Sequence, residues 1–231
     1  MKEEINFVAI NGSPHPHGNT ATVMNWVIEG AKELGAEVEW LQISELDINY
    51  CQGCHTCLKT GKCIIQDDLQ MILEKVKDAD GVIVGSPVYG GRPTAQLKTL
   101  MDRITLLKLY AGILDDSNSI GVATSGIAPT RAVAKDSAAL FGRPIGIIGV
   151  KCATLKEGHK SLQENSNPKK RNKAMKLGRK LVKKSRKSGK AFSLQYCWIN
   201  FLRKHLLSRM LKRNKEQFSG VLDIWKEKGW M

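Results

Sequence analysis

The sequence lacks several features that mark other classes of protein. Its 231 residues contain no apolar run of about 20, the length that a helix needs to cross a bilayer. The N-terminal segment MKEEINFVAI has no cationic stretch followed by a long apolar run, so a signal peptide is not expected. No period of about 20 to 50 residues recurs, which excludes repeat architectures. We therefore expect a cytoplasmic protein, in a reducing compartment where disulfides are uncommon.

Acidic residues are scarce in the last third of the chain. Residues 1–150 hold 13 Lys or Arg and 17 Asp or Glu, whereas residues 151–231 hold 23 and 5, so the net charge of +14 arises in the C-terminal third. The segment 168–187 is basic but places an apolar stripe on one side. That stripe comprises Ala174, Gly178, Leu181, Val182 and Ser185. It predicts the last helix of the fold, apolar toward the sheet and solvated on the other side.

Residues 192–211 mix aromatic and aliphatic side chains with basic ones. This pattern predicts an amphipathic segment beyond the main domain, and we divide the chain into a domain at 1–190 and a helical extension at 191–231. We expect the extension to contact a second subunit in a homodimer or homotetramer. Peripheral contact with an anionic membrane is the alternative, and nucleic acid is not expected because no nucleic-acid motif is present.

Short apolar runs alternate with helical patterns over the first 150 residues. Strands are predicted at 5–10, 36–43, 81–86, 119–125 and 144–150, and helices at 20–34, 68–78, 94–107 and 130–141. Asp67 or Asp68 is the expected N-cap of the second of these helices. Continuous apolar strands joined by helices indicate a parallel sheet that is covered on both faces. We predict a flavodoxin-like, doubly wound α/β fold with five strands in the order 2-1-3-4-5.

Three loops follow strands at the edge where such folds bind ligands. The first, residues 11–22, offers backbone N–H groups, the hydroxyls of Ser13, Thr20 and Thr22, and the amide of Asn19 to an anion. It matches neither a P-loop nor a Rossmann fingerprint. The second carries Pro87, Tyr89, Gly90 and Gly91, and the third carries Ser125 and Gly126. Together these loops describe a mononucleotide crevice.

Four cysteines lie within thirteen residues, at Cys51, Cys54, Cys57 and Cys63. Structural zinc sites commonly use two CxxC pairs separated by a long arm. Here three cysteines recur at intervals of three, the run that holds iron–sulfur clusters in bacterial ferredoxins. We predict a [4Fe–4S] cluster on these four thiolates, with zinc or an empty, partly oxidised site as alternatives. Cys152 and Cys197 lie apart and are expected to be buried apolar residues.

The segments GSPHPHGNT and SPVYGGRPTAQLKTLMDR resemble the NADPH-dependent FMN reductase branch of the flavodoxin-like superfamily. The cysteine spacing, followed by Asp67 and Asp68, resembles the motif of the iron–sulfur flavoproteins. The resemblance implies an FMN phosphate held by Ser13, His15, Asn19 and Thr20. It also implies an isoalloxazine ring lined by Pro87, Val88, Tyr89 and Gly90, with Ser125 and Gly126 approaching from the third loop.

The expected function is that of a flavin-dependent oxidoreductase. It would transfer electrons through FMN and the cluster, between a reduced donor such as NAD(P)H or a ferredoxin-like protein and an unknown acceptor. The acceptor would be a redox partner protein or a small molecule, and the cofactors would carry the chemistry. One alternative is an NAD(P)H-dependent FMN or quinone reductase without a cluster. The other is a non-enzymatic electron carrier.

Overall fold

A computed structural model describes residues 4–115, 117–154, 158–159, 161–162, 167–187 and 201–231. Its centre is a parallel sheet in the strand order β2-β1-β3-β4-β5, which confirms the predicted fold. The strands are β1 (Ile5–Asn11), β2 (Ala36–Gln42), β3 (Gly81–Pro87), β4 (Asn118–Ser125) and β5 (Arg143–Lys151). The strands β1, β3 and β4 are buried almost throughout because helices cover both faces of a parallel sheet, whereas the edge strand β2 exposes two glutamates.

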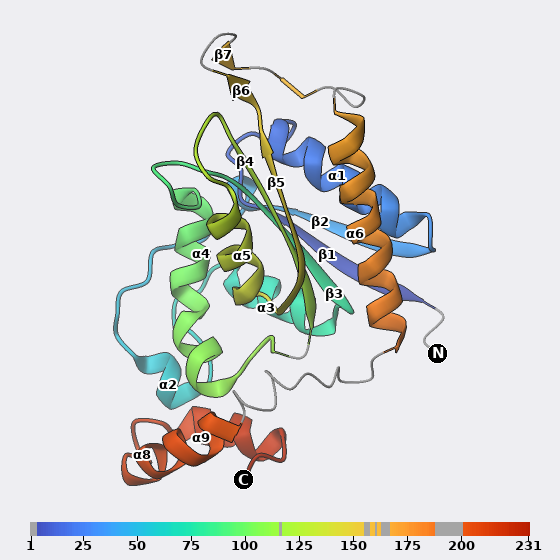
Figure 1. The fold of residues 1–231 in the computed structure, drawn as a ribbon. Helices are drawn as coiled ribbons and strands as arrows, with labels where there is room; N and C mark the ends of the chain where they lie inside the picture. Colours follow the sequence, from blue (N-terminus) through green and yellow to red (C-terminus); the bar gives the residue numbers. More distant parts are fainter. Residues whose placement is uncertain (1–3, 116, 155–157, 160, 163–166, 188–200) are drawn as a thin grey trace.

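Helices cover the two faces of the sheet as predicted (Figure 1). The helices are α1 (Asn19–Lys32), α3 (Leu69–Asp78), α4 (Ala95–Leu106), α5 (Arg131–Leu140) and α6 (Pro168–Lys187). On one face, α1 and α6 pack on a core that includes Phe7, Trp26 and Leu181. On the other face, α3 and α4 pack on a core that includes Val84, Ile72 and Leu97. The positions of the loops that end each strand are therefore fixed by two continuous apolar layers.

The last helix of this domain packs closely on the first. The five residues of the predicted apolar stripe in α6 are all buried, as expected. Gly178 allows the close approach, because a Cβ added there would lie 2.0 Å from the carbonyl oxygen of Val27. Gly30 on α1 is equally crowded, with the carbonyl oxygen of Met175 at 2.1 Å from an added Cβ. The backbones of α1 and α6 therefore contact each other without intervening side chains.

Several shorter elements connect the layers. They are the 3-10 turn η1 (Ile43–Glu45), helix α2 (Thr56–Thr60), the π-helical turn η2 (Leu107–Ala111) and the antiparallel pair β6 (Ala153–Thr154) and β7 (Gly158–His159). Within the described ranges, the helices do not include one that is both long enough and apolar enough to cross a bilayer.

The described part of the predicted extension, residues 201–231, is helical. It contains the π-helical turn η3 (Arg203–Leu207), α8 (Ser208–Arg213) and α9 (Ser219–Glu227). These elements pack on the same chain, against α2 and η2, around a core that includes Leu58, Phe218 and Trp225 (Figure 1). Arg203 forms an ion pair with Asp115 at 2.8 Å, and Trp225 Nε1 donates to the carbonyl oxygen of Tyr110 at 2.9 Å. Residues 188–200 lie outside the described residues, so the domain boundary near 190 and the subunit contact stay predictions.

Candidate functional site

The predicted strand-end loops meet at one cleft of about 350 Å³, here called the strand-end cleft. This size is within the range of small-molecule sites. Nine of the ten residues predicted to bind the flavin line it. They are Ser13, His15, Asn19, Thr20, Pro87, Val88, Tyr89, Ser125 and Gly126. Gly18, Thr124, Cys152 and Ser161 line it as well. Loops separated by more than 100 residues in the sequence therefore line one continuous site.

Gly90 does not line the strand-end cleft. It lies with Gly91 at the tip of a tight turn, whose flanking residues Tyr89 and Arg92 exchange two backbone hydrogen bonds of 2.9 Å. Both glycines have positive φ, 55° and 79°, which two-residue hairpin turns of this kind require. The two glycines thus allow the tight turn, and the half-exposed ring of Tyr89 lies at the edge of the cleft.

The N-terminus of α1 opens into the strand-end cleft. Gly18 occupies the N-cap, where no side chain caps the helix, and the first turn contains no acidic residue. The first N–H groups of an α-helix have no acceptor within the helix, and the helix dipole adds positive potential there. This end of the cleft therefore fits a phosphate group.

Some predicted anion ligands already bond to protein groups. The buried hydroxyls of Thr20 and Thr124 lie 2.7 Å apart and share a hydrogen bond, which leaves one of the two protons for another acceptor. Asn19 Oδ1 accepts from the N–H of Leu162 at 2.7 Å. Ser125 donates its hydroxyl proton to the carbonyl oxygen of Ala128 at 2.6 Å. These side chains shape the loops. The donors left for an anion are backbone N–H groups and the hydroxyl of Ser13, which accepts from the N–H of His15 at 3.1 Å and donates to no group in the described part of the chain.

A buried polar network that the sequence analysis missed holds the first loop. Asn11 Nδ2 donates to Gln42 Oε1 at 2.8 Å, and Gln42 Nε2 donates to the carbonyl oxygen of Ser13 at 2.7 Å. The N–H of Ser13 donates to Asn11 Oδ1 at 3.1 Å. Asn11 and Gln42 are the last residues of the adjacent strands β1 and β2, and both are buried. A polar residue that ends a buried strand was the signal that could have identified them.

Helix α4 ties the first and second loops together. Thr94, its N-cap, donates its hydroxyl proton to the carbonyl oxygen of Gly12 and accepts from the N–H of Leu97. Its own N–H donates to Ser86 Oγ at 3.1 Å. Gly12 in turn donates its N–H to the carbonyl oxygen of Gly85 at 2.8 Å. The strand-end cleft is therefore preformed by contacts within the protein.

Cys152 is the other missed residue of the cleft. It lies just after β5, is 5% exposed, and receives a bond from Asn19. Burial raises the pKa of its thiol, and the contact with Asn19 opposes this only in part. It was expected to be buried, which is confirmed, but its place in the cleft wall was not predicted.

The four clustered cysteines lie on the loop of residues 51–63, here called the thiol loop. Cys51 and Cys54 are exposed, and Cys57 and Cys63 are half-buried. Gly53 (φ 64°) and Gly61 (φ 76°) supply left-handed turns, as expected from the need for a tight wrap. The thiol loop lies beside α3, α4 and the C-terminal helices, away from α6 (Figure 1).

The pKa of the Cys57 thiol depends on the other three thiols of the loop. Burial raises the pKa of Cys57, and the negative charges that Cys63, Cys54 and Cys51 can carry raise this pKa further. At the exposed end, the hydroxyl and N–H of Thr56 lower the pKa of Cys54 by hydrogen bonding to its sulfur. Thiolates that repel one another around Cys57 would be stabilised by a cation bound between them.

The chemistry of the thiol loop fits an iron–sulfur cluster, since four thiolates are its usual ligands. The arrangement is not that of a closed ligand set: in the part of the chain that the structure describes, no three Cys, His, Asp or Glu side chains are grouped to hold a metal ion. All four sulfur donors thus lie on one short loop, but they are too far apart to form a closed ligand set.

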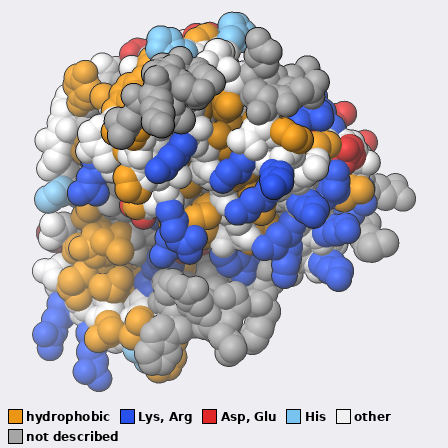
Figure 2. Space-filling model, turned by 45° about the horizontal axis from the view of Figure 1, so that its top comes forward, with side chains coloured by type: hydrophobic (Ala, Val, Ile, Leu, Met, Phe, Trp, Pro, Cys, Tyr) orange, Lys and Arg blue, Asp and Glu red, His pale blue; other side chains and the backbone are white. Residues whose placement is uncertain are grey.

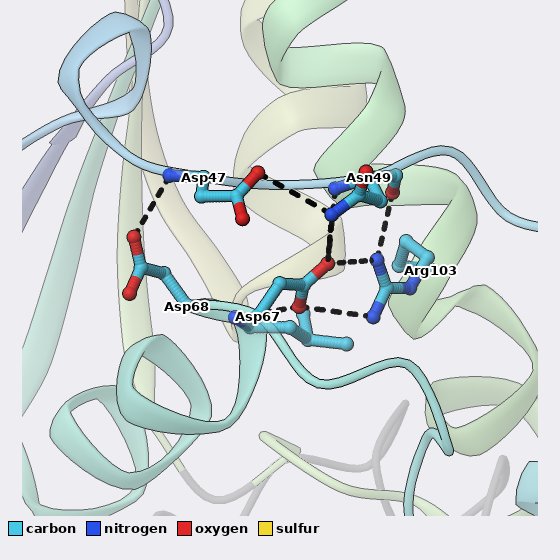
Figure 3. A network of polar contacts seen from close by, with 6 residues as sticks. Asp47, Asn49, Asp67, Asp68 and Arg103 are labelled. Carbon is cyan, nitrogen blue, oxygen red and sulfur yellow. Dashed lines mark hydrogen bonds and ion pairs between the residues drawn. The ribbon is translucent and has the colours of Figure 1, made fainter.

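A buried ion pair brackets the thiol loop (Figure 3). Arg103 on α4 and Asp67 are joined at 2.6 Å, and both side chains are fully buried. Asn49, just before the loop, bonds to both: its N–H donates to Asp67 at 2.9 Å, and its carbonyl oxygen accepts from Arg103 at 2.7 Å. Asp68 accepts from the N–H of Asp47 at 2.8 Å. The two ends of the loop are therefore fastened to each other and to α4.

The same pair explains the start of α3. Asp68 occupies the N-cap position without a side-chain cap, while Asp67 Oδ1 accepts from the N–H of Leu69 at 3.1 Å. Burial alone would raise the pKa of Asp67, but the hydrogen bonds from Arg103, Asn49 and Leu69 outweigh it and hold the pKa below its usual value. Burial also opposes the charge of Arg103, yet Asp67 and Cys63 raise its pKa overall. Arg103, which fastens the loop, therefore also interacts with the thiol of Cys63.

The C-terminal helices cover α2, the helical part of the thiol loop. Leu58 and Cys57 join the apolar core formed by Phe218, Val221 and Trp225. Ser219 donates its hydroxyl proton to the carbonyl oxygen of Lys59 at 2.9 Å. Gly220 approaches Gly61 so closely that an added Cβ would lie 2.0 Å from its nitrogen. Sequence analysis predicted a packing surface on this extension but not its partner within the chain.

Comparisons with known proteins agree with this geometry. The family model for NADPH-dependent FMN reductases matches residues 5–162. An iron–sulfur flavoprotein of Methanocaldococcus jannaschii is 45% identical over 102 residues, 44% of this chain and 53% of that protein. The chain spans about half the length of this and other archaeal relatives that it matches. An iron–sulfur flavoprotein of Clostridioides difficile is 28% identical over 95% of this chain and 97% of its own length.

Solved structures share the fold. A flavone reductase superimposes with a TM-score of 0.60 and 19% identity, covering 82% of this chain and 66% of that chain. An NAD(P)H:quinone oxidoreductase from Methanothermobacter marburgensis superimposes with a TM-score of 0.57 and 16% identity, covering 77% and 97%. At these identities the likeness concerns the path of the backbone.

Proposed function

Since the chain belongs to the NADPH-dependent FMN reductase family, we propose that it is an FMN-dependent oxidoreductase that also carries a [4Fe–4S] cluster. Electrons would pass between a reduced donor, NAD(P)H or a ferredoxin-like protein, and a separate acceptor. The observation that carries this proposal is that one chain presents both a preformed strand-end cleft and four cysteines on one short loop.

The residues of the strand-end cleft would bind and orient FMN. The open N-terminus of α1 would receive the phosphate, with the free proton of the Thr20–Thr124 pair as an added donor. Tyr89 and Val88 would border the ring, and the tight turn at Gly90 would hold Tyr89 in place. When bound, FMN exchanges both hydride and single electrons, which is what a nicotinamide donor and a cluster together require.

The thiol loop would hold the cluster through Cys51, Cys54, Cys57 and Cys63. Half-burial of Cys57 and Cys63 would shield one side from water, while exposed Cys51 and Cys54 would leave the other open to a partner. The fastening of the loop by Asp67 and Arg103 would keep Cys63 beside a guanidinium. A nearby positive charge favours a reduced, more negative centre.

A second candidate is an NAD(P)H-dependent FMN or quinone reductase without a cluster. The open spacing of the thiols among the described residues favours it. One preparation separates the two candidates: protein purified without oxygen, supplied with iron and sulfide, and assayed for flavin, iron and acid-labile sulfide. Stoichiometric FMN with iron and sulfide supports the first candidate, and FMN without iron supports the second.

The flavin assignment has its own test in the double variant Ser13→Ala with Thr20→Ala. Hydrogen bonds to charged groups contribute about 1.5–3 kcal/mol each, so loss of even one should weaken FMN binding by at least about tenfold. The matched control is Thr22→Ala, in the same helix, whose hydroxyl bonds to the carbonyl oxygen of Gly18. FMN titration by fluorescence quenching measures the effect. Equal FMN affinity in the double variant and the wild type would refute the site.

A further inference from the structure

Helix α6 carries seven exposed lysines in a straight row, here called the lysine ridge. Its members are Lys169, Lys173, Lys176, Lys180, Lys183, Lys184 and Lys187. They recur mostly at steps of three or four, so at 100° per residue they all lie within an arc of about 100° on one side of the helix. That stripe is opposite the buried stripe that contacts α1. The ridge spans 18 residue steps, about 27 Å.

The lysine ridge costs the helix stability. Like charges three or four residues apart repel each other, and basic residues in the first turn oppose the helix dipole. The sequence of α6 contains no Asp or Glu that would offset either effect. Charges of both signs would be enough to keep an exposed helix face solvated. A row of charges of one sign therefore indicates an interaction with a negatively charged partner.

The arginines of α6 are used differently from the ridge lysines. Arg171 pairs with Glu29 on α1 at 2.8 Å, and Arg179 pairs with Glu33, the C-cap of α1, at 2.6 Å. Arg186 donates to the carbonyl oxygen of Leu34. Of the ridge lysines, Lys180 bonds to the carbonyl oxygen of Ile145, and the other six have no hydrogen-bond or ion-pair partner within the described ranges. The arginines thus fasten the helix, while the ridge faces outward.

We propose that the lysine ridge is a docking surface for an anionic phospholipid membrane. A straight ridge of point charges can bring all its lysines to a plane at once, whereas a duplex strand curves away from a straight rod. The ridge also lacks the groups that read nucleic acids: α6 has no aromatic residue for stacking, and its arginines bond to α1 and to the two residues that follow it. Figure 2 shows the field of Lys and Arg side chains that this face presents.

The position of the ridge indicates that the surface to which it binds is not the redox partner. α6 covers the sheet face opposite α3 and α4, and the thiol loop lies on the side of α4 (Figure 1). A protein adsorbed through the ridge would therefore leave the thiol loop facing the solution. The inference does not depend on either cofactor.

Vesicle co-sedimentation of the full chain tests the proposal. The wild type should bind vesicles that contain about a quarter phosphatidylserine at about 50 mM salt, and should leave them at about 300 mM, where charges are screened. It should not bind pure phosphatidylcholine. The triple variant Lys173→Glu, Lys176→Glu and Lys183→Glu should lose binding by on the order of a hundredfold or more.

The matched control makes the same change of net charge elsewhere. Lys77, Lys135 and Lys212 are exposed on α3, α5 and α8, and their triple change to Glu should weaken binding far less than the ridge variant. Circular dichroism confirms the fold, and the ridge triple change to Gln replaces the Glu version if that version does not fold. Failure of the wild type to bind, equal loss in both triple variants, or binding to a random DNA duplex without vesicle binding would each overturn the proposal.

Discussion

The loops of the strand-end cleft bond to one another and to residues at the ends of the strands, whereas the thiol loop is held by residues of α4 and of the C-terminal helices. Gln42 fixes Ser13, Thr124 fixes Thr20, and Thr94 fixes Gly12, all at the same edge of the sheet. The thiol loop depends instead on Arg103 at one side and on Ser219 and Gly220 at the other.

This difference indicates how each region behaves without its ligand. The strand-end cleft satisfies its buried polar groups internally, so it keeps its shape when empty. The thiol loop has two exposed cysteines and mutually repelling thiolates, so a bound metal centre would supply the attraction that the protein does not. Changes to the supports of the thiol loop should therefore affect metal content and leave FMN binding largely intact.

The largest expected effect comes from Cys57→Ala. It removes a half-buried thiol from the four proposed ligands, so the iron content of anaerobic protein should fall below about a tenth of the wild-type value. FMN content should stay the same. Cys152→Ala is the matched control, because it removes a thiol from the strand-end cleft and should leave iron unchanged. Iron retained in Cys57→Ala would contradict the ligand set, and zinc in the wild type would make the loop a structural site.

Arg103→Met should have the next largest effect, on stability. It leaves Asp67 buried without its partner, and breaking a buried pair in this way costs about 3–5 kcal/mol in the free energy of unfolding. Lys98→Met is the control on the same helix, since its pair with Asp102 is exposed and worth at most about 1 kcal/mol. Urea unfolding measures both. Equal destabilisation by the two variants would show that the buried pair of Asp67 and Arg103 contributes no more to stability than an exposed ion pair.

Gly220→Val tests the other support. Its branched side chain cannot fit against the nitrogen of Gly61, so α9 must move away from α2 at a cost of about 1–3 kcal/mol. In metal-free protein, Cys57 should then react faster with iodoacetamide, as followed by mass spectrometry, while FMN affinity stays the same. Glu227→Ala, at an exposed position of the same helix, should leave the rate unchanged. An unchanged rate in Gly220→Val would mean that α9 does not cover this thiol.

The smallest expected effect is on acid stability. The pKa of Asp67 is lower in the folded protein than in the unfolded chain, so its contribution is present above the unfolded value, near 4, and is lost as the pH falls through the folded value. Asp67→Asn should be less stable than the wild type at neutral pH, and this gap should narrow below about pH 4. Urea midpoints from pH 7 to pH 3 measure it; a constant gap would refute the role of the charge.

Local patterns predicted most of the sheet and the strand-end cleft. The buried stripe of α6 followed from helical spacing, and nine cleft residues followed from loops placed after apolar strands. The supports of the thiol loop could not be predicted in this way. Asp67 and Arg103 are 36 residues apart, and Gly61 and Gly220 are 159 apart; nothing in the spacing near either residue specifies its partner. Gly90 stays a prediction, because a glycine pair signals both a tight turn, which the structure has, and close approach to a ligand.

The docking of α9 on α2 has a consequence for biosynthesis. A chain is made from its N-terminus, so Cys51, Cys54, Cys57 and Cys63 leave the ribosome long before Ser219 and Gly220. At about 5–20 residues per second, roughly ten to thirty seconds separate the two segments. During that interval α2 has no C-terminal helix beside it, and the thiol of Cys57 lacks the cover that Phe218, Val221 and Trp225 provide. Completion of residues 201–231 ends this interval, so the cover over Cys57 forms only when the last segment of the chain has been made.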